Sequence, residues 1–215
     1  TDAGTDGIMV GGSTAFGILD ETVKEIKSNT NVPVILFPGN VNGLSKHADA
    51  VFFMSMLNSS NPYWIIGAQM LSAPAAMMLG LETISMAYLV VEPGGSAGWV
   101  GEAHLIPRDK NKIAAAYALV AETIGYKLVY FEAGSGASVS VPAEMVRLAS
   151  STVKIPVVVG GGIVKPEQAV DLVRAGAKVI VQGNVVEKTV LTDGGKLLKT
   201  TITQIKQEAR KGKSR

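Results

Sequence analysis

Short runs of apolar, mostly β-branched residues recur along the chain, and they constrain its fold more than any other feature. Such runs are typical of strands that are buried on both faces, as in parallel sheets. Segments with the periodicity of helices separate most of them, and this alternation predicts parallel βαβ units. The seven expected strands are Gly7–Val10, Val34–Phe37, Ala50–Met54, Ile84–Val91, Leu128–Glu132, Pro156–Val159 and Val179–Val181.

Two α/β architectures fit this alternation: an open doubly wound sheet and a closed eight-stranded barrel. The barrel is favoured because no GxGxxG motif opens the first strand–helix turn. A glycine-rich turn followed by a proline-started helix also occurs late in the chain, where phosphate-binding barrels have one. We therefore predict a TIM-type (β/α)8 barrel, a single phosphate-binding domain over residues 1–215. The expected helices are Leu19–Lys27, Ile113–Ile124, Pro142–Ala149, Pro166–Ala175 and Lys196–Arg210.

The predicted barrel departs from the regular pattern in two places. The connection from Phe37 to Ala50 is short and contains Pro38, Gly39 and Gly43, so we expect the third helix to be missing. Residues 2–5 resemble the end of a helix that leads into a strand. Counting to eight therefore predicts that the first strand of the barrel, and most of a helix, come before residue 1.

Composition excludes several classes of protein. Hydrophobic residues make up 47% of the 215 residues and charged residues 18%, which excludes a disordered chain or a coiled coil. A net charge of +2 argues against nucleic acid as a partner. The absence of cysteine excludes disulfides and thiolate chemistry, and fits a cytoplasmic protein. We interpret the apolar stretch from Trp64 to Leu81, which Gly67 and Pro74 interrupt, as a helix buried on most faces rather than a membrane span.

Two glycine motifs follow the last two expected strands. Gly161 and Gly162 precede a helix that begins near Pro166, and Gly183 and Asn184 follow the final strand. Glycines allow a phosphate to approach backbone N–H groups, and a helix N-terminus favours an anion. Either motif alone could simply turn the chain. Both together, after strands seven and eight of a barrel, predict a phosphate site.

The segment Tyr130–Gly136 ends an earlier strand and carries the carboxylate of Glu132. A carboxylate at the C-terminal end of a barrel strand lies on the face where barrel active sites form. The Gly-Ser-Gly turn that follows offers backbone donors and a hydroxyl. This combination suits a polyol phosphate, although a surface glutamate in a flexible turn is the alternative.

Four further features allow two readings each. Ser13, after Gly11-Gly12, could cap a helix or ligate Mg²⁺ beside a phosphate. Trp99, in the glycine-rich loop from Glu92 to Gly101, could stack on a ligand or anchor a subunit contact. Arg108 and Lys110 are weak diphosphate candidates that are better explained as solvated charges. The methionines favour core packing over an apolar ligand site; they are Met54, Met56, Met70, Met77, Met78 and Met86.

Together, these motifs resemble, in the same order and over nearly the whole chain, those of archaeal geranylgeranylglyceryl-phosphate synthases of the larger second group. The resemblance rests on the glycine motifs, the Tyr130–Gly136 segment and the loop Glu92–Gly101 with Ile106–Lys110 after it. It implies a cytoplasmic, Mg²⁺-dependent prenyltransferase that makes the first ether bond of archaeal membrane lipids. The C3 hydroxyl of sn-glycerol 1-phosphate would attack geranylgeranyl diphosphate and release diphosphate. A barrel without its third helix also agrees with the family.

The resemblance also assigns roles to residues. Glu132 is implied to bind the glycerol hydroxyls and is the best candidate for the catalytic base. Ser13 is implied as a Mg²⁺ ligand, beside an aspartate of the family's Asp-Pro-Asp-Lys motif that would precede residue 1. The implied glycerol phosphate site consists of Tyr130, Phe131, Glu132, Ala133, Gly134, Ser135, Gly136, Gly161, Gly162, Gly183 and Asn184.

Other functions remain open at this point. The bacterial relative of the family, heptaprenylglyceryl-phosphate synthase, transfers a longer chain, and groove depth would distinguish the two. An isomerase or aldolase on a phosphate-binding barrel would share the glycines, and so would a ligand-binding barrel without catalysis. We also expect a homo-oligomer, a dimer or a hexamer. Apolar residues such as Trp64, Ile65 and Met78 are more than the inner helix faces of one barrel need, so some should lie in a subunit interface.

Overall fold

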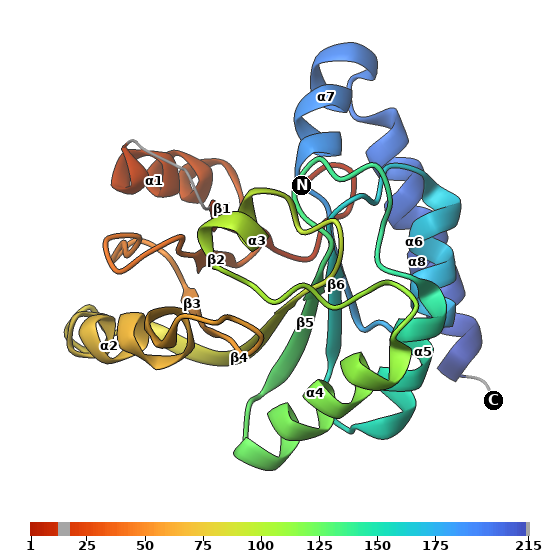
Figure 1. Ribbon diagram of the computed structural model, residues 1–215. Helices are drawn as coiled ribbons and strands as arrows, with labels where there is room; N and C mark the ends of the chain where they lie inside the picture. The colour runs from red at the N-terminus through yellow and green to blue at the C-terminus, as the bar shows by residue number, and fades with distance from the viewer. Residues whose placement is uncertain (13–17, 214–215) are drawn as a thin grey trace.

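The computed structural model describes residues 1–12 and 18–213, which form one curved parallel sheet with helices on its outer face (Figure 1). Each strand pairs in parallel with the next strand along the chain. The seven strands are β1 (Ile8–Gly11), β2 (Val34–Phe37), β3 (Ala50–Met56), β4 (Glu82–Val90), β5 (Leu128–Glu132), β6 (Val157–Gly160) and β7 (Val179–Val181). This order and curvature confirm the TIM-type barrel fold.

The helices alternate with the strands as predicted, with two additions. The helices α3 and α7 were not expected from the sequence. The full set is α1 (Leu19–Asn29), the π-helix η1 (Tyr63–Gly67), α2 (Ala68–Met78), α3 (Gly95–Val100), α4 (Asn111–Ile124), α5 (Ala143–Thr152), α6 (Pro166–Arg174), α7 (Asn184–Asp193) and α8 (Lys196–Lys213).

Within the described residues, the ring of helices and the sheet are both interrupted, at the third helix and between β1 and β7. Residues 38–49, between β2 and β3, form turns and no helix, which confirms that the third helix of the barrel is missing. In the part of the chain that the structure describes, no strand lies between β1 and β7, so the sheet stays open there. The edge strand β7 is correspondingly less covered than the central strands, and Val179 is 45% exposed.

Strand alternation divides the core into two layers. Leu89 and Phe131 point outward and pack with residues of α4, α5 and α6, such as Met145 and Leu172. The residues that alternate with them along the strands point into the barrel. There they form an inner cluster that includes Phe52, Met86, Tyr88, Tyr130 and Val158. Because side chains alternate along a strand, Glu132 at the end of β5 faces the same side as Tyr130. The alternation therefore delivers a carboxylate to the inner face of the barrel.

The prediction that the apolar stretch from Trp64 to Leu81 is buried on most faces is wrong. Only Gln69 and Ala76 of α2 are buried, whereas Met70, Met77 and Met78 are 63%, 79% and 85% exposed. The physical reason lies in the missing helix: with no helix in residues 38–49, α2 lacks the ring neighbour that would cover one of its sides. None of the described helices is long and apolar enough to span a membrane.

Candidate active site

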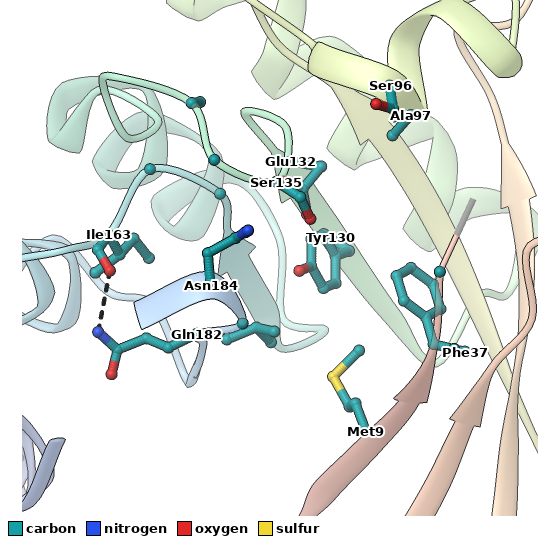
Figure 2. Close-up of a pocket in the computed structure, with 18 of the residues that line it drawn as sticks. Met9, Phe37, Ser96, Ala97, Tyr130, Glu132, Ser135, Ile163, Gln182 and Asn184 are labelled. Carbon is teal, nitrogen blue, oxygen red and sulfur yellow. Dashed lines mark hydrogen bonds between the residues drawn. The ribbon is translucent and has the colours of Figure 1, made fainter. Parts of the chain in front are cut away.

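A cavity of about 650 Å³ opens at the carboxyl ends of the strands, where barrel enzymes carry their active sites (Figure 2). Its wall has two chemically different parts. The polar part comes from the ends of β5, β6 and β7 and includes Glu132, Ser135, Gly161, Gly162, Gly183 and Asn184. The apolar part comes largely from β1, β2, β3 and η1 and includes Met9, Phe37, Met54, Met56 and Trp64.

Glu132 is the acidic group of this cavity, and its side chain is almost wholly buried. The N–H of Gly134 donates to its Oε1 at 2.6 Å, and the hydroxyls of Tyr88 and Tyr130 hydrogen-bond to the same carboxylate. Burial raises the pKa of Glu132, and the three hydrogen bonds offset only part of that rise. Burial, together with the nearby charge of Glu132, also raises the pKa of both tyrosines well above the usual value, so they remain protonated donors.

These three donors limit what Glu132 can do with a substrate. A carboxylate offers about four lone-pair positions for hydrogen bonds. The N–H of Gly134 occupies one of them, and the hydroxyls of Tyr88 and Tyr130 also interact with the carboxylate. The carboxylate still has acceptor capacity for a ligand in the cavity, enough to accept a hydrogen bond from one hydroxyl.

The first glycine motif lies directly against this carboxylate. Gly161 and Gly162 have φ angles of +80° and +66°, in the left-handed region that favours glycine. A Cβ at Gly161 would overlap Glu132 Oε1 and would lie 2.6 Å from the nitrogen of Gly134. The Tyr130–Gly136 segment and the Gly161-Gly162 turn, about 30 residues apart in the sequence, therefore form one continuous surface.

The two glycine motifs also face the same space. Gly183 is the N-cap of α7, and Asn184 begins that helix. In the described chain, the N–H groups of Gly161, Gly162 and Gly183 donate to no protein acceptor. Figure 2 shows Asn184 and Ser135 directed toward the same part of the cavity. Backbone donors at a helix N-terminus, together with an amide and a hydroxyl, make a site suited to a phosphate.

Two glutamines hold the glycine loop in place. The amide of Gln182 donates to the Ile163 carbonyl at 3.0 Å, which links the loop after β6 to the end of β7 (Figure 2). The Gln168 Oε1 accepts from the N–H groups of Val164 and Lys165 at the start of α6. Neither glutamine was predicted from the sequence, although Gln168 occupies the third helical position where a capping residue is common.

Most of the predicted substrate-binding residues line the cavity, and three do not. Phe131 and Ala133 are fully buried in the outer core, because strand alternation directs them away from the barrel. The N–H of Gly134 already donates to Glu132. Ser13, the predicted metal ligand, lies outside the described residues. Those that do line it are Tyr130, Glu132, Ser135, Gly136, Gly161, Gly162, Gly183 and Asn184.

Sequence reasoning missed Tyr88, which contributes directly to the environment of Glu132. Tyr88 is opposite Tyr130 in the β4–β5 register, and the two ring centroids are 5.2 Å apart. Phe37 completes this group, with its ring stacked 5.8 Å from that of Tyr130. A tyrosine within an apolar strand was the available signal, but only the register and the packing show that it lies beside Tyr130 and interacts with Glu132.

Several other residues from the sequence analysis lie away from the cavity. Trp99 is 85% exposed and does not line the cavity wall. Lys110 is exposed and pairs with Asp109, and Arg108 donates to the Glu92 carbonyl at 3.2 Å. The interpretation as solvated charges agrees with the exposure of Lys110, whereas Arg108 is half-buried and holds a backbone carbonyl. Of the methionines, Met54 and Met56 line the cavity, and Met86 is buried in the barrel interior.

Comparisons with known proteins agree with this geometry. The model of the PcrB family matches residues 1–204. Geranylgeranylglyceryl phosphate synthase of Thermococcus sibiricus is 54% identical over 209 residues, which is 96% of this chain and 82% of the relative. The Pyrococcus horikoshii protein of the same name is 56% identical over 189 residues, or 87% of this chain and 74% of the relative.

A solved structure extends the likeness to three dimensions. The crystal structure of (S)-3-O-geranylgeranylglyceryl phosphate synthase from Thermoplasma acidophilum, in complex with its substrate sn-glycerol-1-phosphate, matches with a TM-score of 0.93 and 46% identity. The match covers 96% of this chain and 83% of the Thermoplasma chain. The fold, the two-part cavity and these similarities lead to one conclusion: the chain belongs to the PcrB family.

Proposed function

We propose that this protein transfers a geranylgeranyl group from geranylgeranyl diphosphate to the C3 hydroxyl of sn-glycerol 1-phosphate, with release of diphosphate. The observation that carries the proposal is the two-part cavity, in which a buried carboxylate and a glycine cradle adjoin an apolar wall. The cradle consists of Gly161, Gly162, Gly183 and Asn184. The named activity of the archaeal relatives and the glycerol phosphate bound by the Thermoplasma relative support it.

The polar part of the cavity binds and orients the glycerol phosphate. The N–H groups of Gly161, Gly162 and Gly183 donate to the phosphate. Asn184, at the N-terminus of α7, adds its side-chain amide. The glycerol chain then extends toward Glu132, whose remaining acceptor position takes the C3 hydroxyl. Tyr88 and Tyr130 hold the carboxylate in a single orientation while it does so.

Transfer then requires one proton to move and two bonds to change. The C3 oxygen forms a bond to the first carbon of the prenyl chain, and the bond from that carbon to the diphosphate oxygen breaks. The hydroxyl proton passes to Glu132 as the new bond forms. The apolar wall, with Met9, Phe37 and Met54, excludes water that would otherwise capture the allylic cation.

Direct product analysis tests the proposal. Incubation with sn-glycerol 1-phosphate and geranylgeranyl diphosphate should yield geranylgeranylglyceryl phosphate and diphosphate in equal amounts by mass spectrometry and a diphosphate assay. An isomerase or aldolase would release no diphosphate from this pair of substrates, and a non-catalytic barrel would bind both compounds unchanged.

Trp64 is expected to limit the length of the prenyl chain. Its side chain lines both the main cavity and a smaller hollow of about 40 Å³ that adjoins it behind β3. We predict that Trp64→Ala joins the two spaces, and that kcat/KM with a heptaprenyl diphosphate rises relative to geranylgeranyl diphosphate. Competition between the two diphosphates measures the ratio. The control variant Trp99→Ala removes a tryptophan side chain from an exposed position and should leave the ratio of the two kcat/KM values unchanged. An unchanged ratio in the Trp64→Ala variant would contradict the prediction.

Magnesium dependence is part of the proposal, with Ser13 as one ligand. Bound Mg²⁺ would neutralise negative charge on the leaving diphosphate. The described residues do not form such a site by themselves: they contain no group of three acidic or histidine side chains that could hold a metal. Glu132, the carboxylate in the cavity wall, is already engaged by three donors.

Metal removal should separate binding from transfer. We expect excess EDTA to abolish product formation and added Mg²⁺ to restore it, with EDTA saturated by Mg²⁺ as the control. The affinity for sn-glycerol 1-phosphate should persist in EDTA by calorimetry, because Glu132 and the glycine cradle need no metal. Full transfer activity in EDTA would show that the magnesium proposal is wrong.

The homo-oligomer expected from the sequence also stays a prediction, now motivated by the exposed methionines of α2.

A further inference from the structure

Lys188 is a charged residue of the cavity wall that the proposed mechanism does not use. Among the described residues that line the cavity, Glu132 and Lys188 carry the formal charges. Lys188 is exposed to solvent, and its ammonium group makes no hydrogen bond or ion pair with the part of the chain that the structure describes. A cation without a protein partner, on the wall of a cavity proposed to hold two anionic substrates, is available to one of them.

The position of Lys188 on α7 directs it toward the glycine cradle. Lys188 follows Asn184 by four residues, so the two side chains lie on the same face of the helix, one turn apart. Side chains of a helix lean toward its N-terminus. The long, unbranched stem of Lys188 therefore leans back toward Asn184 and Gly183, which form the second half of the cradle.

The cradle itself lacks a full positive charge. Its donors are backbone N–H groups and the Asn184 amide, and α7 adds only the partial charge of a helix N-terminus. A phosphate monoester carries up to two negative charges near neutral pH. A lysine ammonium is a common partner of phosphates, which it binds as a point charge with three donors.

We propose that Lys188 binds the phosphate group of the glycerol phosphate substrate and makes the site selective for the phosphorylated polyol over the uncharged one. The inference rests on the proposed function for the identity of the anion. The position of Lys188 favours this phosphate over the diphosphate, because Lys188 is on α7, the helix that begins at Gly183 and Asn184 of the cradle. The apolar wall that takes the prenyl chain comes from β1, β2, β3 and η1 instead.

Calorimetry on the full chain with sn-glycerol 1-phosphate tests the proposal. Lys188→Gln should raise the Kd about 10- to 100-fold, the usual effect of losing one charge-assisted hydrogen bond. Lys188→Arg keeps the charge and should recover most of the affinity. Lys199→Gln, which removes an exposed lysine of α8 outside the cavity wall, should leave the Kd unchanged.

Kinetics and a second ligand separate substrate binding from a general structural effect. The KM for glycerol phosphate should rise in Lys188→Gln while kcat and the KM for geranylgeranyl diphosphate stay near the wild-type values. The inhibition constant of inorganic phosphate, measured against glycerol phosphate, should rise as well. Weak binding of glycerol itself should not change, because it lacks the phosphate.

The possible outcomes separate this inference from the proposed function. If wild-type protein does not bind glycerol phosphate, the proposed function fails, and this inference with it. If wild-type protein binds it and Lys188→Gln binds it equally well, only the role of Lys188 is wrong. A rise confined to the KM for the prenyl diphosphate would likewise overturn it, because Lys188 would then serve the other substrate.

Discussion

Replacement of Glu132 with glutamine should lower kcat roughly 10²–10⁴-fold, the usual contribution of a general base. Glutamine has nearly the same size, and its amide can accept from the N–H of Gly134 and donate to a tyrosine hydroxyl, so the cavity should keep its shape. What it loses is the negative charge and the basic lone pair that would take the C3 hydroxyl proton. Affinity for glycerol phosphate should fall much less, because the glycine cradle remains.

The pH profile provides an independent measurement of the same role. Because burial raises the pKa of Glu132, the base should become protonated at a higher pH than an ordinary glutamate. The kcat/KM of the wild-type protein should therefore fall as the pH drops through this raised pKa, and the glutamine variant should lack that limb. Glu167→Gln, an exposed position at the start of α6, is the matched control and should keep both rate and profile.

Two other results would reassign Glu132. If the KM for glycerol phosphate rises while kcat stays nearly intact, the carboxylate orients the glycerol and proton removal follows bond formation. If neither parameter changes, Glu132 is a structural residue of the turn and the proposed base is wrong.

Alanine at Gly161 should damage both stability and substrate binding. Its φ of +80° is unfavourable for alanine, and the new Cβ would overlap Glu132 Oε1 and lie 2.6 Å and 2.9 Å from the nitrogens of Gly134 and Ala133. Backbone strain and overpacking together should cost about 2–5 kcal/mol of the free energy of unfolding. Chemical denaturation measures this loss, and calorimetry should show glycerol phosphate binding weakened by more than tenfold, since the loop and the carboxylate must separate.

Gly125→Ala isolates the effect of the crowding. Gly125 also has a left-handed φ, +99°, but a Cβ there would meet nothing within 4 Å, and it lies at the end of α4, outside the cavity wall. This variant should lose only the smaller amount due to backbone strain and should bind glycerol phosphate normally. Equal losses in the two variants would show that the contact between Gly161 and Glu132 is unimportant.

The structure also shows why two helices escaped prediction. The helix α3 (Gly95–Val100) is six residues long and contains two glycines, which disfavour helices in isolation. Its formation depends on tight packing: a Cβ at Gly98 would lie 2.9 Å from the Leu105 side chain. In α7, apolar and polar residues alternate irregularly, and the helix begins directly after the last strand. Local patterns could not identify either one.

The sequence by itself determined the strands, their order and the end of the sheet that carries the site. This was possible because parallel strands buried on both faces need near-continuous apolar runs, and because the carboxyl ends of such strands meet on one side. The same reasoning located Glu132 and both glycine motifs at that end, and identified the connection after Phe37 that lacks a helix.

Only the tertiary structure decided which of these residues face one another. Strand alternation turned Tyr130 and Glu132 into the barrel and Phe131 and Ala133 away from it, and the β4–β5 register placed Tyr88 opposite Tyr130. Whether an apolar helix is covered depends on its neighbours, so the exposure of α2 could not be read from its own residues. Contacts between distant segments follow from register and packing, which a local pattern does not encode.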